Sequence, residues 1–171
     1  MSVFLQPIYT QTIASNVASV TFNNIPQTFT DLKLVISSRG AAGNYTDVLP
    51  ITINGNFNLS ARWLEGTNAT VGSSNATSGQ NYAVYVREPA STATANTFSN
   101  VEMYIPSYTG SNFKSFIMDV ASENSSSTNY HVQFYAGLYP STSAITSIGF
   151  LVSNGAIVQH STFTLYGILK G

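Results

Sequence analysis

The side chains that could carry nucleophilic or acid–base chemistry are few. The chain has two histidines, His131 and His160, and no cysteine. Nucleophilic hydrolysis needs a nucleophile, a base and an orienting group within hydrogen-bonding reach. His131 alternates with Gln133 and Tyr135 opposite the apolar residues of its strand, so we expect it to face solvent. His160 lies beside a turn, and the chain has no Gly-x-Ser-x-Gly motif. We therefore predict no catalytic residues and no enzymatic activity.

The carboxylates are the next candidates, because a pair of them can cleave a glycosidic bond. They are Asp31, Asp47, Glu65, Glu88, Glu102, Asp119 and Glu123. Asp119 and Glu123 fall on one face of an expected strand, where their spacing separates them by about 13 Å. That distance is too wide for either glycosidase geometry. We interpret the carboxylates as solvated acids on polar faces, and pairing across strands stays open.

Metal, phosphate and nucleic-acid sites have no signature in this sequence. There is no His-x-x-x-His motif and no Asp-rich calcium loop, and Gly40–Gly43 lacks the lysine of a phosphate-binding loop. The basic residues occur singly, whereas nucleic acids and anionic membranes bind clustered Lys and Arg. They are Lys33, Arg39, Arg62, Arg87, Lys114 and Lys170. We predict no metal, no cofactor, no nucleic-acid partner and no membrane partner.

Two aromatic residues could contact a ligand on the surface. Trp63 is the only tryptophan, and Tyr108 lies in a Gly- and Ser-containing turn region. An exposed aromatic side chain can anchor a sugar or a partner protein. A lone tryptophan more often packs partly into the core, so both interpretations of Trp63 stay open.

The N-terminal segment carries apolar bulk ahead of the first clear strand. Its apolar residues are Phe4, Leu5, Ile8 and Tyr9. The segment could be an edge strand of the protein's own sheet, or an arm laid across a neighbour by strand addition. Both alternatives stay open, and these residues are our candidate assembly contacts.

The composition indicates which elements hold these side chains. Of the 171 residues, 43% are hydrophobic, which is usual for a globular domain, but only 8% are charged. Charged residues normally make up roughly 25% of a domain. Ser, Thr and Asn replace them, together with ten Tyr and ten Phe. β-Branched and aromatic residues favour strands, and Ser and Asn favour turns. The composition therefore predicts an all-β protein.

Period-2 alternation of apolar residues predicts where the strands lie. The expected strands are Ala18–Phe22, Leu32–Ser38, Pro50–Ile53, Leu59–Leu64, Tyr82–Arg87, Val101–Ile105, Lys114–Glu123, Tyr130–Tyr139, Ile145–Val152 and Ser161–Leu169. Core-facing sets are Leu32, Leu34 and Ile36; Phe116, Met118 and Val120; and Val132, Phe134, Ala136 and Leu138. Hairpin-type turns are expected at Asn54-Gly55 and Asn154-Gly155.

These elements predict one antiparallel β-sandwich of about eight to ten strands, with a jelly roll as the favoured version. Residues 1–15 form the arm or edge strand, and residues 16–171 form a single β-sandwich domain. The stretches Gly66–Gln80 and Pro89–Asn96 are expected to be long surface loops. The N-terminus lacks the features of a signal peptide, and no apolar run is long enough to span a membrane. We expect a protein made in a cytoplasm.

Several segments resemble those of a group of tailed-bacteriophage virion structural proteins. In that group an "ASVTF…IP…T-Y/F-TDL-x-LV" pattern opens the domain, "IEIYIPNY…KSF" lies in the middle and "TLYGI" lies near the end. The matching segments here are Ala18–Phe22, Ile25–Leu32, Leu34–Ile36, Arg62–Gly66, Val101–Tyr108, Lys114–Phe116 and Thr162–Ile168. The resemblance spans nearly the whole chain, and its motifs are structural.

The resemblance implies a jelly-roll-like sandwich that assembles as a homotrimer. It implies a location in the virion, on the outer surface of the head, with the major capsid protein or other virion proteins as partners. The function we expect is that of a capsid decoration (cement) subunit that stabilises the shell. The alternative is a tail-fibre or receptor-binding module, in which Trp63 and Tyr108 would contact the host surface.

Overall fold

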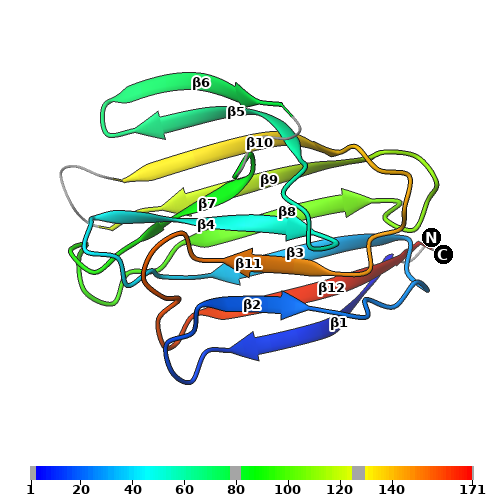
Figure 1. Cartoon of the computed structure of the whole chain (residues 1–171), viewed down its shortest axis with the longest axis horizontal. Coiled ribbons are helices and arrows are strands. Elements are labelled where there is room, and N and C mark those ends of the chain that lie inside the picture. Colours follow the sequence, from blue (N-terminus) through cyan, green and yellow to red (C-terminus); the bar gives the residue numbers. More distant parts are fainter. Residues whose placement is uncertain (1–2, 78–81, 125–129, 171) are drawn as a thin grey trace.

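The structure of the chain is a computed structural model that describes residues 3–77, 82–124 and 130–170. Every regular element in these ranges is a β-strand (Figure 1). The strands are β1 (Val3–Thr12), β2 (Ser19–Phe22), β3 (Asp31–Ser37), β4 (Thr46–Ile53), β5 (Ser60–Thr67), β6 (Thr70–Ala76), β7 (Tyr85–Pro89), β8 (Asn100–Pro106), β9 (Lys114–Ser122), β10 (His131–Tyr139), β11 (Ile148–Leu151) and β12 (Thr162–Lys170).

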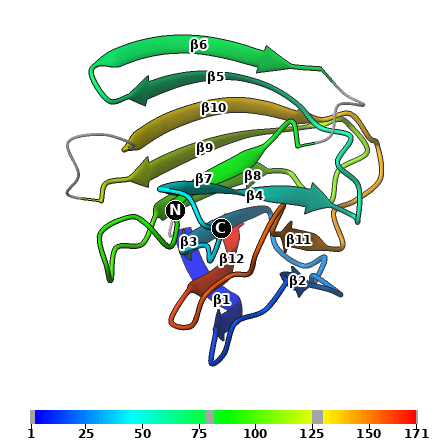
Figure 2. The same cartoon turned by 60° about the vertical axis from the view of Figure 1, so that its left-hand side comes forward.

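The strands form two antiparallel sheets that pack as layers. The larger sheet has the order β1-β12-β3-β8-β9-β10-β5-β6, and the smaller has the order β2-β11-β4-β7. Figure 2 shows the smaller sheet against one face of the larger sheet. The strands β5 and β6 lie at the end of the larger sheet opposite β1. The predicted all-β sandwich is confirmed, with twelve strands in the described residues rather than eight to ten.

Alternating strands supply the core between the sheets. Leu32, Leu34 and Ile36 of β3 are buried, as are Phe116, Met118 and Val120 of β9, so the predicted facing of both strands is confirmed. The smaller sheet contributes side chains such as Leu49, Ile51 and Phe150. A strand with one face on a core buries every second residue, which is the pattern that the sequence shows.

The predicted facing of β10 is wrong. His131, Gln133 and Tyr135 are buried, whereas Val132, Phe134 and Ala136 are exposed. Pairing decides this: Tyr135 lies opposite the buried Met118 of β9 and opposite Trp63 of β5. Both faces of β10 carry large side chains, so alternation alone does not identify the inner face.

Residues 3–12 form β1, which pairs with β12 at one edge of the larger sheet. The register shifts between Pro7 and Tyr9, because a bulge interrupts the ladder there. Proline has no backbone N–H to donate to a ladder, so it is tolerated on an edge strand. The Tyr9 ring stacks on Phe22 at a centroid distance of 5.3 Å, which ties the strand to the smaller sheet.

The region expected to be a long loop after Gly66 contains a strand instead. β5 and β6 form a hairpin in which Thr67 pairs with Thr70 across Asn68 and Ala69. Asn68 adopts a positive φ of 53°, as tight hairpin turns require. Residues 78–80 of the expected loop lie outside the described residues.

The expected turn at Asn54-Gly55 is present, with positive φ at both residues and mutual backbone hydrogen bonds between Ile53 and Asn56. An antiparallel bridge between Ile53 and Asn56 confirms the hairpin-type turn, but the strands on its two sides, β4 and β5, belong to different sheets and do not pair. At Asn154-Gly155, Gly155 has a positive φ of 82°, and the strands on the two sides, β11 and β12, also belong to different sheets. These two turns carry the chain from one layer to the other.

Candidate functional site

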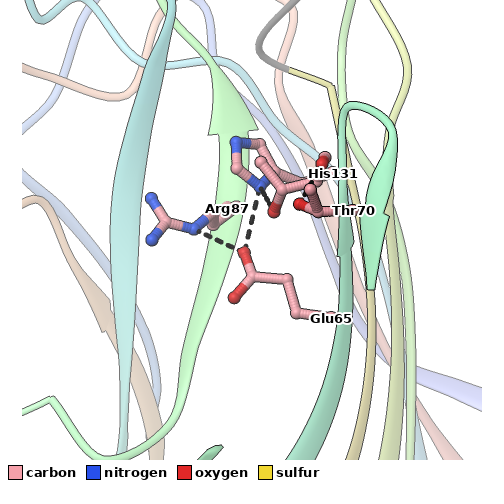
Figure 3. A network of polar contacts seen from close by, with 5 residues as sticks. Glu65, Thr70, Arg87 and His131 are labelled. Atoms are coloured by element: carbon pink, nitrogen blue, oxygen red, sulfur yellow. Dashed lines mark hydrogen bonds and ion pairs between the residues drawn. The ribbon is translucent and has the colours of Figure 1, made fainter. Parts of the chain in front are cut away.

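A polar network lies where β5, β7 and β10 approach one another (Figure 3). Glu65 and His131 project from the inner face of the larger sheet, and Arg87 reaches them from β7. The Oε1 atom of Glu65 accepts a hydrogen bond from Arg87 Nε at 3.0 Å and lies 3.0 Å from His131 Nδ1. One carboxylate therefore links both sheets.

Two threonines complete the network. The Thr67 hydroxyl lies 3.1 Å from the same Nδ1 atom of His131, and the Thr70 hydroxyl donates to the Thr67 carbonyl at 2.8 Å. Burial and the positive charge of Arg87 lower the pKa of His131, and the Glu65 carboxylate opposes this shift. The imidazole is thus held in its neutral form in a partly buried ion-pair network.

Aromatic rings surround the network on one side. Trp63 stacks on Tyr135 at a centroid distance of 5.5 Å, and Tyr85 meets Tyr135 edge-on at 6.2 Å. The Arg87 guanidinium lies 5.6 Å from the centre of the Tyr85 ring. The cation–π contact stabilises the position of Arg87, and the aromatic pairs stabilise the packing beside the network.

The chemistry available to this network follows from which atoms meet. In a Ser-His-Asp triad the carboxylate meets one imidazole nitrogen and the nucleophilic hydroxyl meets the other. Here Glu65 and Thr67 both meet Nδ1 of His131. This arrangement orients the imidazole, and the hydrogen bond from Arg87 to Glu65 clamps β7 of the smaller sheet to β5.

The clamp makes a testable prediction for Glu65→Gln. We expect a further fall in the pKa of His131, because the variant loses the charge that raises it. We also expect a loss of stability of about 1–3 kcal/mol, because Arg87 loses a charged hydrogen-bond partner in a partly buried site. NMR titration of His131 and urea unfolding measure the two effects.

The matched control is Glu102→Gln, which removes a surface ion pair with Lys33. We expect less than about 1 kcal/mol from that change and an unchanged His131 titration. An unchanged His131 titration in Glu65→Gln would contradict the network.

The four candidate assembly contacts differ in how far their side chains are buried. Phe4 and Leu5 are exposed on β1, whereas Ile8 and Tyr9 pack against the core. Trp63 also packs partly against the core, and its side chain lines a hollow of about 180 Å³ together with Glu65 and Thr67. Only Phe4 and Leu5 of these residues present large apolar area to solvent.

Tyr108 is not a surface residue, so its assignment as a candidate ligand contact is wrong. Its side chain is fully buried, and its hydroxyl donates to the Pro26 carbonyl. The residue joins the segment after β8 to the segment before β3. Its turn-rich sequence neighbourhood suggested exposure, but long-range packing covers it.

The interpretation of all the carboxylates as solvated is also wrong. Asp47 of β4 and Glu88 of β7 are paired neighbours in the smaller sheet, and both are buried. They meet over Gly40, where a Cβ atom would lie 3.0 Å from Asp47 Oδ2 and 3.0 Å from Glu88 Oε1. Asp31 is buried as well, and accepts hydrogen bonds from the Tyr104 hydroxyl and the Ser107 amide.

Electrostatics at the Asp47–Glu88 pair favour the protonated form. Burial and the neighbouring Asp47 carboxyl raise the pKa of Glu88 to about 8, and the Ser38 hydroxyl opposes the shift. Burial also raises the pKa of Asp47, against hydrogen bonds from the Val48 amide and the Ser153 hydroxyl. Two neighbouring carboxyl groups in the interior would repel each other if both were ionised, so at most one of them ionises readily.

A group of large apolar side chains lies on the outward face of the larger sheet at its β6 end. We call it the outer apolar face, and it consists of Leu64, Val71, Ile117, Val132 and Phe134. Their exposed fractions are 57%, 86%, 47%, 58% and 44%. A hollow of about 340 Å³ beside it is lined by Arg62, Leu64 and Phe134, among others. The alternation of apolar residues in β10 predicts that Val132 and Phe134 face the core, so the sequence alone does not reveal this surface.

Across residues 3–77, 82–124 and 130–170, no group of three or more His, Cys, Asp or Glu side chains is placed to hold a metal ion. The part of the chain that the structure describes holds no helix with the length and apolar character needed to cross a membrane. Comparisons with protein-family models, curated proteins and solved structures returned no match.

Proposed function

We propose that this chain is a structural subunit of a tailed-phage virion that decorates the outside of the head and stabilises the shell. The virion assignment rests on the sequence resemblance. The observation that best supports an assembly role is the amount of large apolar side chain left on the surface of a chain with only 8% charged residues. Such surfaces are typical of proteins that bind other proteins.

The β1 edge is the proposed attachment surface. Phe4 and Leu5 are exposed at one end of the larger sheet, and Leu169 of the neighbouring β12 is exposed beside Phe4. An edge strand has unpaired backbone groups that can add a strand from another chain. The β1 edge can therefore bind another chain through backbone hydrogen bonds and through its exposed apolar side chains.

The strand order supports a jelly roll as the finer description of the fold. Four neighbouring strands of the larger sheet have the order β1-β12-β3-β8, and the smaller sheet has the order β2-β11-β4-β7. These eight follow the order of a jelly roll, with the β5–β6 and β9–β10 hairpins inserted. The insertions lengthen one sheet, and they carry Glu65 and His131 of the polar network as well as the outer apolar face.

The distribution of cations supports the outside of the shell over its DNA-facing side. Arg39 and Lys114 are buried, where they donate hydrogen bonds to backbone carbonyls. Arg87 and Lys33 are paired with carboxylates. Neutralising several phosphates needs clustered free cations. A decoration subunit needs none: binding only the assembled shell stabilises it by mass action.

The attachment surface is tested by the double variant Phe4→Ser/Leu5→Ser. We expect its affinity for capsids to fall at least about tenfold, since two apolar anchors are lost, while its folding stability changes little. Deleting the first nine residues is a poorer test, because it also removes the stacking of Tyr9 on Phe22. Co-sedimentation with undecorated capsids measures the affinity.

Phe113→Ser is the matched control, because Phe113 is exposed in the loop between β8 and β9. Equal capsid binding by the double variant and the control would contradict attachment through β1. Location is measured by quantitative proteomics of purified virions against the major capsid protein. Hundreds of copies would support the head lattice, whereas a few copies would favour the tail-associated alternative.

A further inference from the structure

We propose that the outer apolar face binds a second copy of this chain, in a two-fold symmetric contact centred on β10. The inference deepens the proposed function by naming a partner for a surface distinct from the β1 edge. It is carried by three properties of the face: the contiguity of its apolar side chains, their area and the placement of two charges at its flanks.

Strand register makes the apolar side chains contiguous. Phe134 of β10 lies directly opposite Leu64 of β5, and both face outward. Val132 lies opposite Gly66, whose neighbour across the hairpin is Val71. The residue opposite Ile117 of β9 is Ala136 of β10, two residues from Phe134 on the same face. The five large side chains thus share one patch over four neighbouring strands.

The exposed apolar area of the patch is large enough for the centre of an interface with a second copy of this chain. The exposed parts of the five side chains amount to roughly 500 Å², near the upper end for the largest apolar patch on a monomer. A standard interface buries about 800 Å² per partner, and about 60% of that area is apolar. The patch therefore supplies the apolar centre of one standard interface.

The charges flanking the patch are self-complementary. Arg62 lies on β5, on one side of β10, and Asp119 lies on β9, on the other side. Both are exposed, and neither makes an ion pair within the described part of the chain. A two-fold axis parallel to β10 places β5 of one copy over β9 of the other. Arg62 of each copy then approaches Asp119 of its partner, in two equivalent pairs.

This self-complementarity selects a second copy as the occupant. A two-fold interface uses the same patch on both subunits, so each residue and its contact occur twice. One cation and one anion on opposite sides of an apolar centre meet that requirement without any other chain. With both charges on one side of β10, neither would meet a charged residue of the partner across this axis.

The test is a charge exchange followed by sedimentation equilibrium of the full chain. Arg62→Asp alone and Asp119→Arg alone each bring like charges together, so we expect the dimer Kd to rise at least about tenfold. The double variant Arg62→Asp/Asp119→Arg reverses both partners, and we expect its Kd to return to within about threefold of the original. Recovery by the double variant distinguishes pairing from a general loss of fold.

Phe134→Ser tests the apolar centre, with Phe113→Ser as the control outside the patch. We expect the first to raise the dimer Kd by at least about a hundredfold and the second to leave it unchanged, with both proteins folded by circular dichroism. A monomeric wild-type protein at high concentration would overturn the proposal. A trimeric mass would overturn the two-fold arrangement in favour of the trimer that the sequence resemblance implies.

The experiments distinguish failure of the proposed dimer from failure of the proposed decoration function. Variants at Arg62, Asp119 and Phe134 are read in the isolated protein, without capsids. Variants at Phe4 and Leu5 are read by capsid binding and leave the outer apolar face intact. A protein that dimerises through this face and binds no capsid would overturn the decoration role alone.

Discussion

The Glu88→Gln variant is expected to be more stable than the natural protein by about 4 kcal/mol above pH 8. Glu88 is fully buried beside Asp47, and its pKa is raised from 4.5 to about 8. Glutamine has nearly the same shape and never ionises, so it avoids placing a charge in the interior. Urea unfolding of both proteins between pH 4 and 9 measures the difference.

The sign follows from proton binding. Between pH 4.5 and 8 the folded protein keeps the proton of Glu88, whereas the unfolded chain releases it. The free energy of unfolding of the natural protein therefore falls as the pH rises through this window, and it levels off above pH 8. The pKa of His131 is lowered from 6.5, which affects stability only at lower pH. The slope between pH 6.5 and 8 thus reports the acid pair.

Glu102→Gln serves as the control, because Glu102 lies on the surface in an ion pair with Lys33. Its pH profile should follow that of the natural protein. A Glu88→Gln variant with the same slope between pH 6.5 and 8 as the natural protein would show that Glu88 ionises normally. That result would argue against the burial of the pair.

Phe163→Ala is expected to destabilise the protein by about 3–5 kcal/mol, because it leaves a cavity in the middle of the sandwich. Phe163 of β12 is fully buried and contacts Phe150 of β11 at a centroid distance of 5.0 Å. The two rings belong to different sheets, so the truncation removes a contact between the layers. Thermal unfolding should show a Tm lower by roughly 6–20 °C.

The same truncation at an exposed position gives the comparison. Phe113→Ala should cost less than about 1 kcal/mol, because the ring of Phe113 is already largely in water. Similar losses from the two variants would mean that the sheets do not pack through Phe150 and Phe163.

Local pattern accounts for the parts of the fold that sequence analysis predicted correctly. The alternation of Leu32, Leu34 and Ile36 identifies both the strand β3 and its inner face, because the intervening side chains are less apolar or shorter. The strand β9 is identified in the same way by Phe116 and Met118. Both strands can be predicted from their own residues, without knowing which strands pair with them.

The strand β6 was missed because its residues are those of a turn. Thr70–Ala76 contains Gly, Ser and Asn, and six of its seven residues are exposed. Its strand conformation depends on the ladder with β5 across the hairpin, which the pattern of apolar residues does not reveal. Asn68 in the short segment before it was the available signal, since Asn readily takes the positive φ of a hairpin turn.

The sites depended even more on long-range contacts. Glu65, Arg87 and His131 come from three strands, and nothing in their spacing indicates that they meet. The pairing of Asp47 with Glu88 is a matter of register between β4 and β7. The carboxylates of this chain are isolated in sequence, so burial could not be inferred from their neighbours.

Composition and period-2 alternation predict the all-β class, the position of most strands and a surface poor in charge, because both act locally. The inward face of β10, the burial of Tyr108 and Glu88 and the exposure of Phe134 depend instead on tertiary contacts. A strand with large side chains on both faces has two self-consistent orientations. The strands that pair with it and the sheet that covers it select one, and those are contacts between residues far apart in the chain.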